Sequence, residues 1–383
     1  MDTRLDEPRR LGHRPVLDGL RGIAILLVML THTNVLPNGY VGVDLFFALS
    51  GFLITTLLYE EWYRTGGISL RRFYGRRARR LLPALGLMIV IALMIDVVCY
   101  PMTGWPFGWK ALTSALFVNN WLAATGHAKA LGSLNPTWSL AQEEQFYLVW
   151  PLVLIMLLRH RARPHLVAGV LLVAIALLMA AAPTGDKGQG YSVYYSPAAR
   201  AAELLFGCLG AVIWRHRMLG IPQALKHRLP VDIVATLTRR RLWRALFAVV
   251  LAYLFAMLLF DYQLSTEEVY LSACLLAVPL IVNLVGTPDS PLARVIACPP
   301  LRFLGRVSYA LYLFHLLTRN VVYHYMPNGN LYVNALLTIS ISIALAAASW
   351  KIVESRVLAR GRIKPQVQTV RPQPIGRLVP VRT

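Results

Sequence analysis

Long apolar stretches separated by short polar segments run through almost the whole of this 383-residue chain. A helix needs about 20 predominantly apolar residues to cross the roughly 30 Å hydrocarbon core of a bilayer. By this measure the pattern predicts ten membrane-spanning helices, at residues 16–34, 41–62, 81–100, 138–158, 165–182, 198–214, 244–260, 269–286, 304–326 and 331–350. A shorter apolar piece, Trp109–Ala124, favours a re-entrant or interfacial segment. The predicted fold class is an all-α, polytopic integral membrane protein.

Composition supports this fold class, because 56% of the residues are hydrophobic, only 15% are charged, and the mean hydropathy is +0.53. The net charge of +21 raises the alternative of a nucleic-acid partner, which the positions of the charges exclude. With the N-terminus inside, 33 of the 39 Lys and Arg residues fall in segments on the inner side, as expected for cytoplasmic loops. A full crossing at Trp109–Ala124 would abolish this bias. We therefore expect a multi-pass protein of the cell (inner or plasma) membrane with both termini in the cytoplasm.

The predicted domain organisation has three parts. Residues 1–15 form a cytoplasmic N-terminal segment without a cleavable signal, residues 16–355 form one transmembrane domain, and residues 356–383 form a basic tail that we expect to be disordered. The four cysteines are far apart, so neither a metal site nor a disulfide framework is expected. The oligomeric state is left open.

Ionisable residues inside the predicted spans are the first candidates for function, because burying a charge in a membrane is costly. Arg21 and His32 lie eleven positions apart, about 16 Å along a helix, and share one of its faces. The structural alternative is that Asp18 pairs with Arg21 and that His32 bonds to a backbone carbonyl.

A cluster of arginines precedes the third predicted span. Arg76, Arg77 and Arg80 have helical spacing, and guanidinium groups bind phosphate with two parallel hydrogen bonds. Ordinary anchoring of a cytoplasmic loop explains most of the positive charge in this stretch. The grouping nevertheless predicts a site for a cytosolic ligand that carries phosphate.

The fourth predicted span begins with two adjacent carboxylates, Glu143 and Glu144, among aromatic residues that include Tyr147, a candidate for substrate binding. As structure they are the start of a helix in an interfacial aromatic belt. As chemistry, Glu143 lies on the same side of the membrane as His32 and is a candidate to orient the imidazole.

Two further groups are candidates for substrate binding. Arg200 and Glu203 are three positions apart and either pair with each other or line an acceptor site. Ser308, Tyr312 and His315 form one helical stripe, for which packing is the structural alternative. Two other ionisable residues, Asp96 and Arg319, receive no role from the sequence.

Taken together, six stretches in this order resemble the membrane-bound acyltransferase-3 superfamily, which includes bacterial O-acyltransferases of cell-surface sugars and secondary metabolites. The resemblance covers about Arg14 to Ser355. The stretches are Leu17–Gly22 with His32 eleven residues after Arg21, Gly42–Ile54, Phe73–Pro83, Thr137–Tyr147, Arg200–Leu204 and Gly305–Tyr309.

This resemblance implies transfer of an acyl group, acetyl by default, from cytosolic acyl-CoA to a hydroxyl of a carbohydrate or metabolite acceptor outside the cytoplasm. It implies that His32 is the catalytic histidine, that Arg21 is its motif partner, and that Arg77 and Arg80 lie near the acyl donor. It also implies that a chain without an appended extracytoplasmic domain completes the transfer itself or hands the acyl group to a partner.

The resulting hypothesis is that the arginine cluster holds the phosphates of CoA while His32, oriented by Glu143, deprotonates the acceptor hydroxyl. No metal is expected, and the lipid bilayer, acyl-CoA and the acceptor are the expected partners. The alternative from another class is a transporter or flippase, since buried Arg, His and Glu residues also line translocation paths. The absence of a repeat between the two halves of the chain argues against that alternative.

Overall fold

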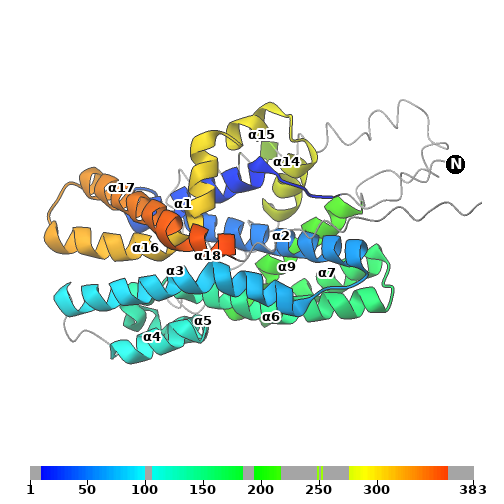
Figure 1. Cartoon of the computed structure of the whole chain (residues 1–383), viewed down its shortest axis with the longest axis horizontal. Helices are drawn as coiled ribbons and strands as arrows, with labels where there is room; N and C mark the ends of the chain where they lie inside the picture. Colours follow the sequence, from blue (N-terminus) through cyan, green and yellow to red (C-terminus); the bar gives the residue numbers. More distant parts are fainter. Residues whose placement is uncertain are drawn as a thin grey trace, which may run out of the picture.

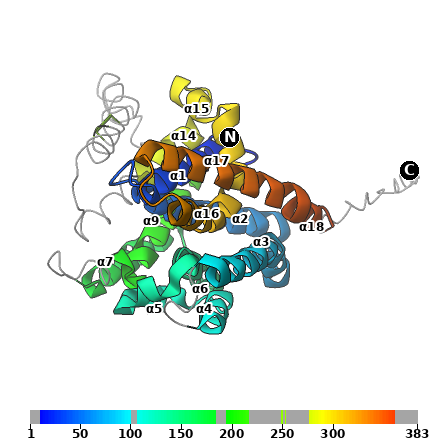
Figure 2. The ribbon, with the colours of Figure 1, turned by 90° about the vertical axis from the view of Figure 1, so that its left-hand side faces the viewer.

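The computed structural model describes residues 10–99, 106–183, 194–216, 248–249, 252 and 276–360. Every regular element in these ranges is a helix, as the sequence predicts. Figure 1 shows long helices packed side by side along the longest axis of the molecule, and Figure 2 shows the same bundle from one end.

The described ranges contain eight helices of 18 residues or more. They are α1 (Pro15–His32), α2 (Val41–Thr65), α3 (Leu70–Cys99), α6 (Thr137–Arg159), α7 (Pro164–Ala181), α9 (Pro197–Arg215), α16 (Pro299–Tyr325) and α17 (Leu331–Ser349). All but α6 and α16 are also apolar enough to cross a membrane, which makes six candidate spans and indicates a multi-pass membrane protein.

The predicted count of ten spans is not confirmed. Eight of the predicted stretches correspond to the eight long helices. The stretch 244–260 lies almost wholly outside the described residues, and the stretch 269–286 is described only from residue 276, as a helix over Leu276–Ile281 that continues into α14 (Val282–Gly286). Helices α6 and α16 are long enough to span a bilayer, but the polar residues that they carry lower their hydropathy.

Helix α3 differs from its predicted bounds. The sequence pattern places a loop before residue 81, whereas the helix already begins at Leu70 and continues through Pro83. Arginine, leucine and alanine all favour helix, although a run of arginines resembles a loop by hydropathy alone. The 30 residues of α3 extend about 45 Å, so the arginine cluster occupies its first turns beyond the length that a bilayer core requires.

The segment Trp109–Ala124 is broken into short pieces. It contains most of α4 (Phe107–Ala115), then α5 (Asn119–Leu122) and the first turn of the helix over Ala123–His127. None of these is long enough to cross a membrane. Figures 1 and 2 show α4 and α5 beside each other at one end of the bundle. There the Lys110 ammonium lies 2.9 Å from the Asp96 carboxylate, which gives Asp96 an electrostatic partner.

Glycines allow two pairs of helices to approach closely. On α16, a Cβ atom at Gly305 would lie 1.8 Å from the Asp18 carbonyl oxygen of α1. Between α2 and α9, a Cβ at Gly51 would lie 1.9 Å from the Leu204 carbonyl oxygen, and one at Gly207 would lie 2.1 Å from the Ala48 carbonyl oxygen. No side chain fits at these distances, so the glycines fix how α1 lies on α16 and how α2 lies on α9.

The direction of the helices gives the bundle two distinct ends. We call the basic end the one where α1 and α3 begin and where α2 and α9 end; it carries the arginines of the first turns of α3. We call the histidine end the opposite one, where α1 ends at His32 and where α16 ends. Figure 2 views the bundle from the histidine end.

Candidate active site

A cavity of about 100 Å³ lies among α1, α2, α3, α6 and α16, and we call it the central chamber. Seven of the residues singled out in the sequence line it: Arg21, Arg77, Arg80, Glu143, Tyr147, Ser308 and Tyr312. Each helix contributes at least one polar side chain. Residues that are far apart in the sequence therefore meet at one site.

The guanidinium of Arg77 is held by two neighbours on α6. Its Nη2 atom lies 2.5 Å from Oε1 of Glu144, and its Cζ atom lies 3.5 Å from the centre of the Tyr147 ring. Both side chains of this ion pair are mostly buried, with 21% and 17% of their surface exposed. The charge of Arg77 is thus balanced within the protein, and the pair joins α3 to α6.

Two other charged residues of the chamber are bound to serines. Arg21 donates from Nε and Nη2 to Oγ of Ser308, both at 3.3 Å, and Glu143 accepts from Oγ of Ser50 at 2.8 Å. The alternative pair of Asp18 with Arg21 is not formed, because the Asp18 carboxylate lies 3.7 Å from Nε2 of His13 instead.

At the histidine end, the ring of His32 lies edge-on to the ring of His315, with 4.8 Å between their centres. Nδ1 of His32 is 2.8 Å from the Val28 carbonyl oxygen, and Nδ1 of His315 is 2.7 Å from the Tyr312 carbonyl oxygen. Since a carbonyl only accepts, both Nδ1 atoms carry the hydrogen in the neutral rings, and each Nε2 keeps a lone pair. The hydrogen bond from His32 to a backbone carbonyl, which the sequence gives as the structural alternative, therefore leaves Nε2 unprotonated and basic.

Glu143 is not the partner of His32. The ring of His32 contacts Val28 and His315, whereas Glu143 faces Ser50 inside the central chamber. The predicted orientation of the imidazole by this carboxylate is therefore not the arrangement in the structure. Both α1 and α6 contribute side chains to the chamber, but the α1 residue that lines it together with Glu143 is Arg21, not His32.

Tyr312 connects the chamber to the histidines. Its hydroxyl lines the chamber and accepts a hydrogen bond of 2.7 Å from Oγ of Ser139, and the centre of its ring lies 5.5 Å from that of His315. The central chamber and the histidine pair are therefore neighbouring parts of one site.

Arg319 adds a cation beside the histidines, one helical turn beyond His315 on α16. Its Cζ atom lies 4.8 Å from the centre of the Tyr323 ring, and the Tyr323 hydroxyl donates to the Thr33 carbonyl next to His32. The Nε atom of Arg319 is buried and has no hydrogen-bond partner among the described residues. Its spacing of four from His315 within an apolar run is the sequence signal that could have identified it.

The structure separates Arg76 from the other two arginines of the predicted cluster. Consecutive residues on a helix point about 100° apart, so Arg77 faces the chamber while Arg76 lies 3.4 Å from the Glu61 carboxylate at the basic end. The prediction that Arg76, Arg77 and Arg80 form one binding surface is therefore wrong for Arg76.

Arg200 and Glu203 line neither the central chamber nor a larger cavity at the basic end of the bundle. Nη1 of Arg200 lies 2.5 Å from Asp44 and 2.6 Å from Glu203, and all three side chains are completely buried. Tyr194 packs beside this cluster, 4.6 Å from Cζ of Arg200, and its burial raises the pKa of the phenol well above the usual value. The ion cluster ties α9 to α2, which is the structural alternative of the two that the sequence left open.

Among the described residues, no group of three or more His, Cys, Asp or Glu side chains is arranged to hold a metal ion. Cys208 is buried and Cys298 is half-buried, and both are free.

Comparison with known families decides the class. A family model described as an acyltransferase domain matches residues 14–353. The chain belongs to this acyltransferase family. The match covers all eight long helices, and it agrees with the family that the sequence motifs indicate.

Similar proteins come from three bacterial species. The chain is 31% identical over 367 residues to the peptidoglycan O-acetyltransferase OatA of Listeria monocytogenes and 32% identical over 378 residues to the O-acetyltransferase OatA of Staphylococcus aureus. The alignments cover 91% and 94% of this chain but 56% and 60% of those proteins. A putative peptidoglycan O-acetyltransferase of Bacillus subtilis, YrhL, is 31% identical over 91% of the chain and 55% of its own length. No solved structure matches.

Proposed function

We propose that this chain is a membrane O-acetyltransferase that takes an acetyl group from cytosolic acetyl-CoA and transfers it to a hydroxyl of a peptidoglycan-type carbohydrate outside the cytoplasm. The observation that carries the proposal is the His32–His315 pair, in which both Nε2 atoms keep a lone pair next to a chamber inside the bundle. The carbohydrate class comes from the names of two relatives, a peptidoglycan O-acetyltransferase and a putative one, of whose length the alignments cover 56% and 55%.

The first step of the proposed reaction is proton removal by His32. A hydroxyl becomes an effective nucleophile toward a thioester when a base near neutral pKa takes its proton as the bond forms. Nε2 of His32 is available for this role because Nδ1 is occupied by the Val28 carbonyl. His315 packs against the ring of His32 and is proposed as a positioning residue.

The second step places negative charge on the thioester carbonyl oxygen. The acceptor oxygen bonds to the carbonyl carbon, the C–S bond then breaks, and the CoA sulfur leaves as the thiol with the proton from His32. Arg319 is proposed to stabilise the oxyanion, because its buried Nε–H points to no acceptor among the described residues and lies one turn from His315.

The size of the central chamber favours a short acyl group. At about 100 Å³ it is smaller than an engineered apolar cavity of about 150 Å³ that takes up benzene. Together with the acetyltransferase names of the relatives, this volume supports acetyl as the group transferred. The excess of Lys and Arg at the basic end supports a cytoplasmic position for it, and with it the proposed direction of transfer.

Transport is the second function that the sequence left open, and no observation favours it. The family model and the relatives are acyltransferases, and the polar residues of the chamber are bound to one another rather than arranged along a continuous path.

The proposal is tested with the full chain in proteoliposomes, given acetyl-CoA labelled in the acetyl group and a muropeptide or chitooligosaccharide acceptor. The expected result is release of CoA together with labelled ester on the acceptor. Labelled substrate that crosses the membrane without cleavage of the thioester would instead support transport.

A further inference from the structure

A second cavity, of about 540 Å³, opens at the basic end, and we call it the basic-end cavity. It lies where α2 ends, α3 begins and α9 ends. Four arginines and two glutamates supply its charges: Arg10, Arg64, Arg76, Arg215, Glu60 and Glu61. The lining therefore carries an excess of positive charge, and its volume falls within the range of about 300 to 1,000 Å³ that is usual for small-molecule sites.

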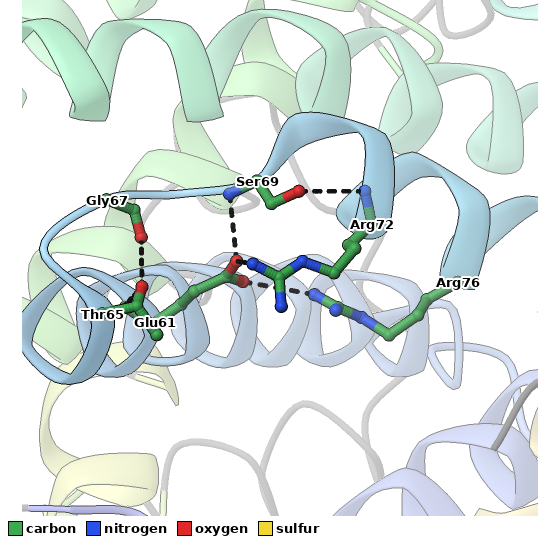
Figure 3. Close-up of polar contacts among 6 residues, drawn as sticks. All are labelled: Glu61, Thr65, Gly67, Ser69, Arg72 and Arg76. Atoms are coloured by element: carbon green, nitrogen blue, oxygen red, sulfur yellow. Dashed lines mark hydrogen bonds and ion pairs between the residues drawn. The ribbon is translucent and has the colours of Figure 1, made fainter. Parts of the chain in front are cut away.

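The two glutamates of this cavity bind backbone N–H groups of neighbouring segments. Figure 3 shows Glu61 at the corner between α2 and α3, where it accepts a hydrogen bond of 2.9 Å from the Ser69 backbone N–H and faces Arg72 and Arg76. Glu60 accepts a hydrogen bond from the backbone N–H of Leu11. These contacts fix the corner and balance part of the charge of Arg72 and Arg76, and the cavity lining still holds four arginines against two glutamates.

Three further arginines, Arg10, Arg64 and Arg215, line the cavity. Arg10 and Arg64 are exposed and form no ion pair with another described residue. The guanidinium of Arg215 is held against aromatic faces, with Cζ 5.7 Å from the centre of the Tyr59 ring and 5.1 Å from that of Tyr63. Guanidinium groups around one hollow match the oxygens of a phosphate ester.

The central chamber does not serve this purpose. It is about one fifth of the volume of the basic-end cavity, and Arg77 inside it is already paired with Glu144. The two cavities are nevertheless adjacent on α3, since Arg76 lines one and the next residue, Arg77, lines the other. One elongated molecule could place a phosphate-bearing end in the larger cavity and its other end in the chamber.

We propose that the basic-end cavity binds phosphate esters and that its ligand is the nucleotide end of the acyl-CoA donor. This inference rests on the proposed function for the identity of the donor. Of the predicted arginine cluster it keeps Arg76 as a phosphate ligand, and it replaces Arg77 and Arg80 by Arg10, Arg64 and Arg215. The phosphate of an anionic lipid headgroup has the same chemistry, so the experiment separates the two sources.

The test measures binding to the full chain in nanodiscs of neutral lipid. The ligands are CoA, dephospho-CoA and adenosine 3′,5′-bisphosphate, and the variants are Arg64→Gln/Arg215→Gln and Arg76→Gln. The control is Arg159→Gln/Arg161→Gln, which removes two exposed arginines that line neither cavity. Each lost arginine–phosphate contact is expected to raise the Kd of CoA about tenfold, with a parallel rise in the KM for acetyl-CoA. The control variant should match the wild type.

Three outcomes decide the matter. Unchanged CoA binding in both cavity variants, while the wild type still transfers acetyl, overturns this inference and leaves the proposed function intact. Weaker binding of a short-chain anionic phospholipid, added to the same neutral nanodiscs, without a change for CoA, overturns the nucleotide assignment in favour of a lipid headgroup. Weaker CoA binding in the variants of a chain that transfers no acetyl group supports the cavity and contradicts the proposed function.

Discussion

The imidazole of His32, at the end of α1, meets the imidazole of His315, in the middle of α16, edge to face at 4.8 Å. The two helices reach this distance because Gly305 places its backbone directly against that of Asp18. Backbone carbonyls occupy both Nδ1 atoms, so both basic nitrogens are the Nε2 atoms. A pair held in this way has a fixed tautomer before any substrate arrives.

Replacement of Arg319 tests the oxyanion role proposed for it. We expect Arg319→Gln to lower kcat for acetyl transfer by about 10²- to 10³-fold, which is the usual effect of removing one oxyanion donor. Arg319→Lys should recover part of the rate because it restores a positive charge. The measurement is CoA release at saturating acetyl-CoA, and a kcat equal to that of the wild type in Arg319→Gln would exclude the role.

The volume of the central chamber should limit the length of the donor. We expect kcat/KM to fall from acetyl-CoA to butanoyl-CoA and hexanoyl-CoA. Phe46 lines the chamber, so Phe46→Ala should enlarge it and shift the preference toward the longer donors. Competition between the three donors, followed by mass spectrometry of the product esters, gives the ratios directly. Equal preference in the wild type and in Phe46→Ala would show that the chamber does not hold the acyl chain.

The ion pair between Arg77 and Glu144 should couple α3 to α6. We expect a double-mutant cycle of Arg77→Gln and Glu144→Gln to give an interaction free energy of about 1 to 3 kcal/mol, since both side chains are mostly buried. The free energy of unfolding in detergent supplies the four values. Strict additivity of the two single changes would mean that the pair contributes nothing to stability.

Close packing at Gly305 should make that position intolerant of a side chain. We expect Gly305→Val to lower the free energy of unfolding by 3 kcal/mol or more, about the upper end of overpacking effects, because its Cβ would meet the Asp18 carbonyl. Gly86→Val on α3 is the matched control, since a Cβ there has no neighbour within 4 Å. Similar thermal midpoints for the two variants would show that α1 and α16 separate easily.

Much of the fold could be predicted from hydrophobic pattern alone, because apolar runs of span length mark helices. Eight of the ten predicted stretches correspond to long helices, and the stretch at 244–260 lies almost wholly outside the described residues. The hydropathy pattern places the start of α3 eleven residues too late. Arginine favours helix, but its low hydropathy makes an arginine-rich stretch resemble a loop.

The sequence predicts which residues belong to the candidate site but not which of them contact one another. Arg21 and His32 stand out because they are ionisable within an apolar run. Ser308 and His315 are also candidates, but the sequence does not pair them with Arg21 and His32, which lie 287 and 283 residues away. Such contacts depend on how α1 and α16 pack. Because the sequence does not show how helices pack, it predicts Glu143 as the partner of His32, whereas the structure pairs Glu143 with Ser50.

The central claim is that His32 is the base of an acetyl transfer, and one measurement tests it most directly. His32→Asn retains an N–H group near the Val28 carbonyl but removes the basic nitrogen, so it should preserve the fold. In proteoliposomes with labelled acetyl-CoA and a muropeptide acceptor, we expect this variant to lose about 10²- to 10⁴-fold in kcat while its thermal midpoint stays close to that of the wild type. A variant that transfers acetyl at the rate of the wild type would contradict the account.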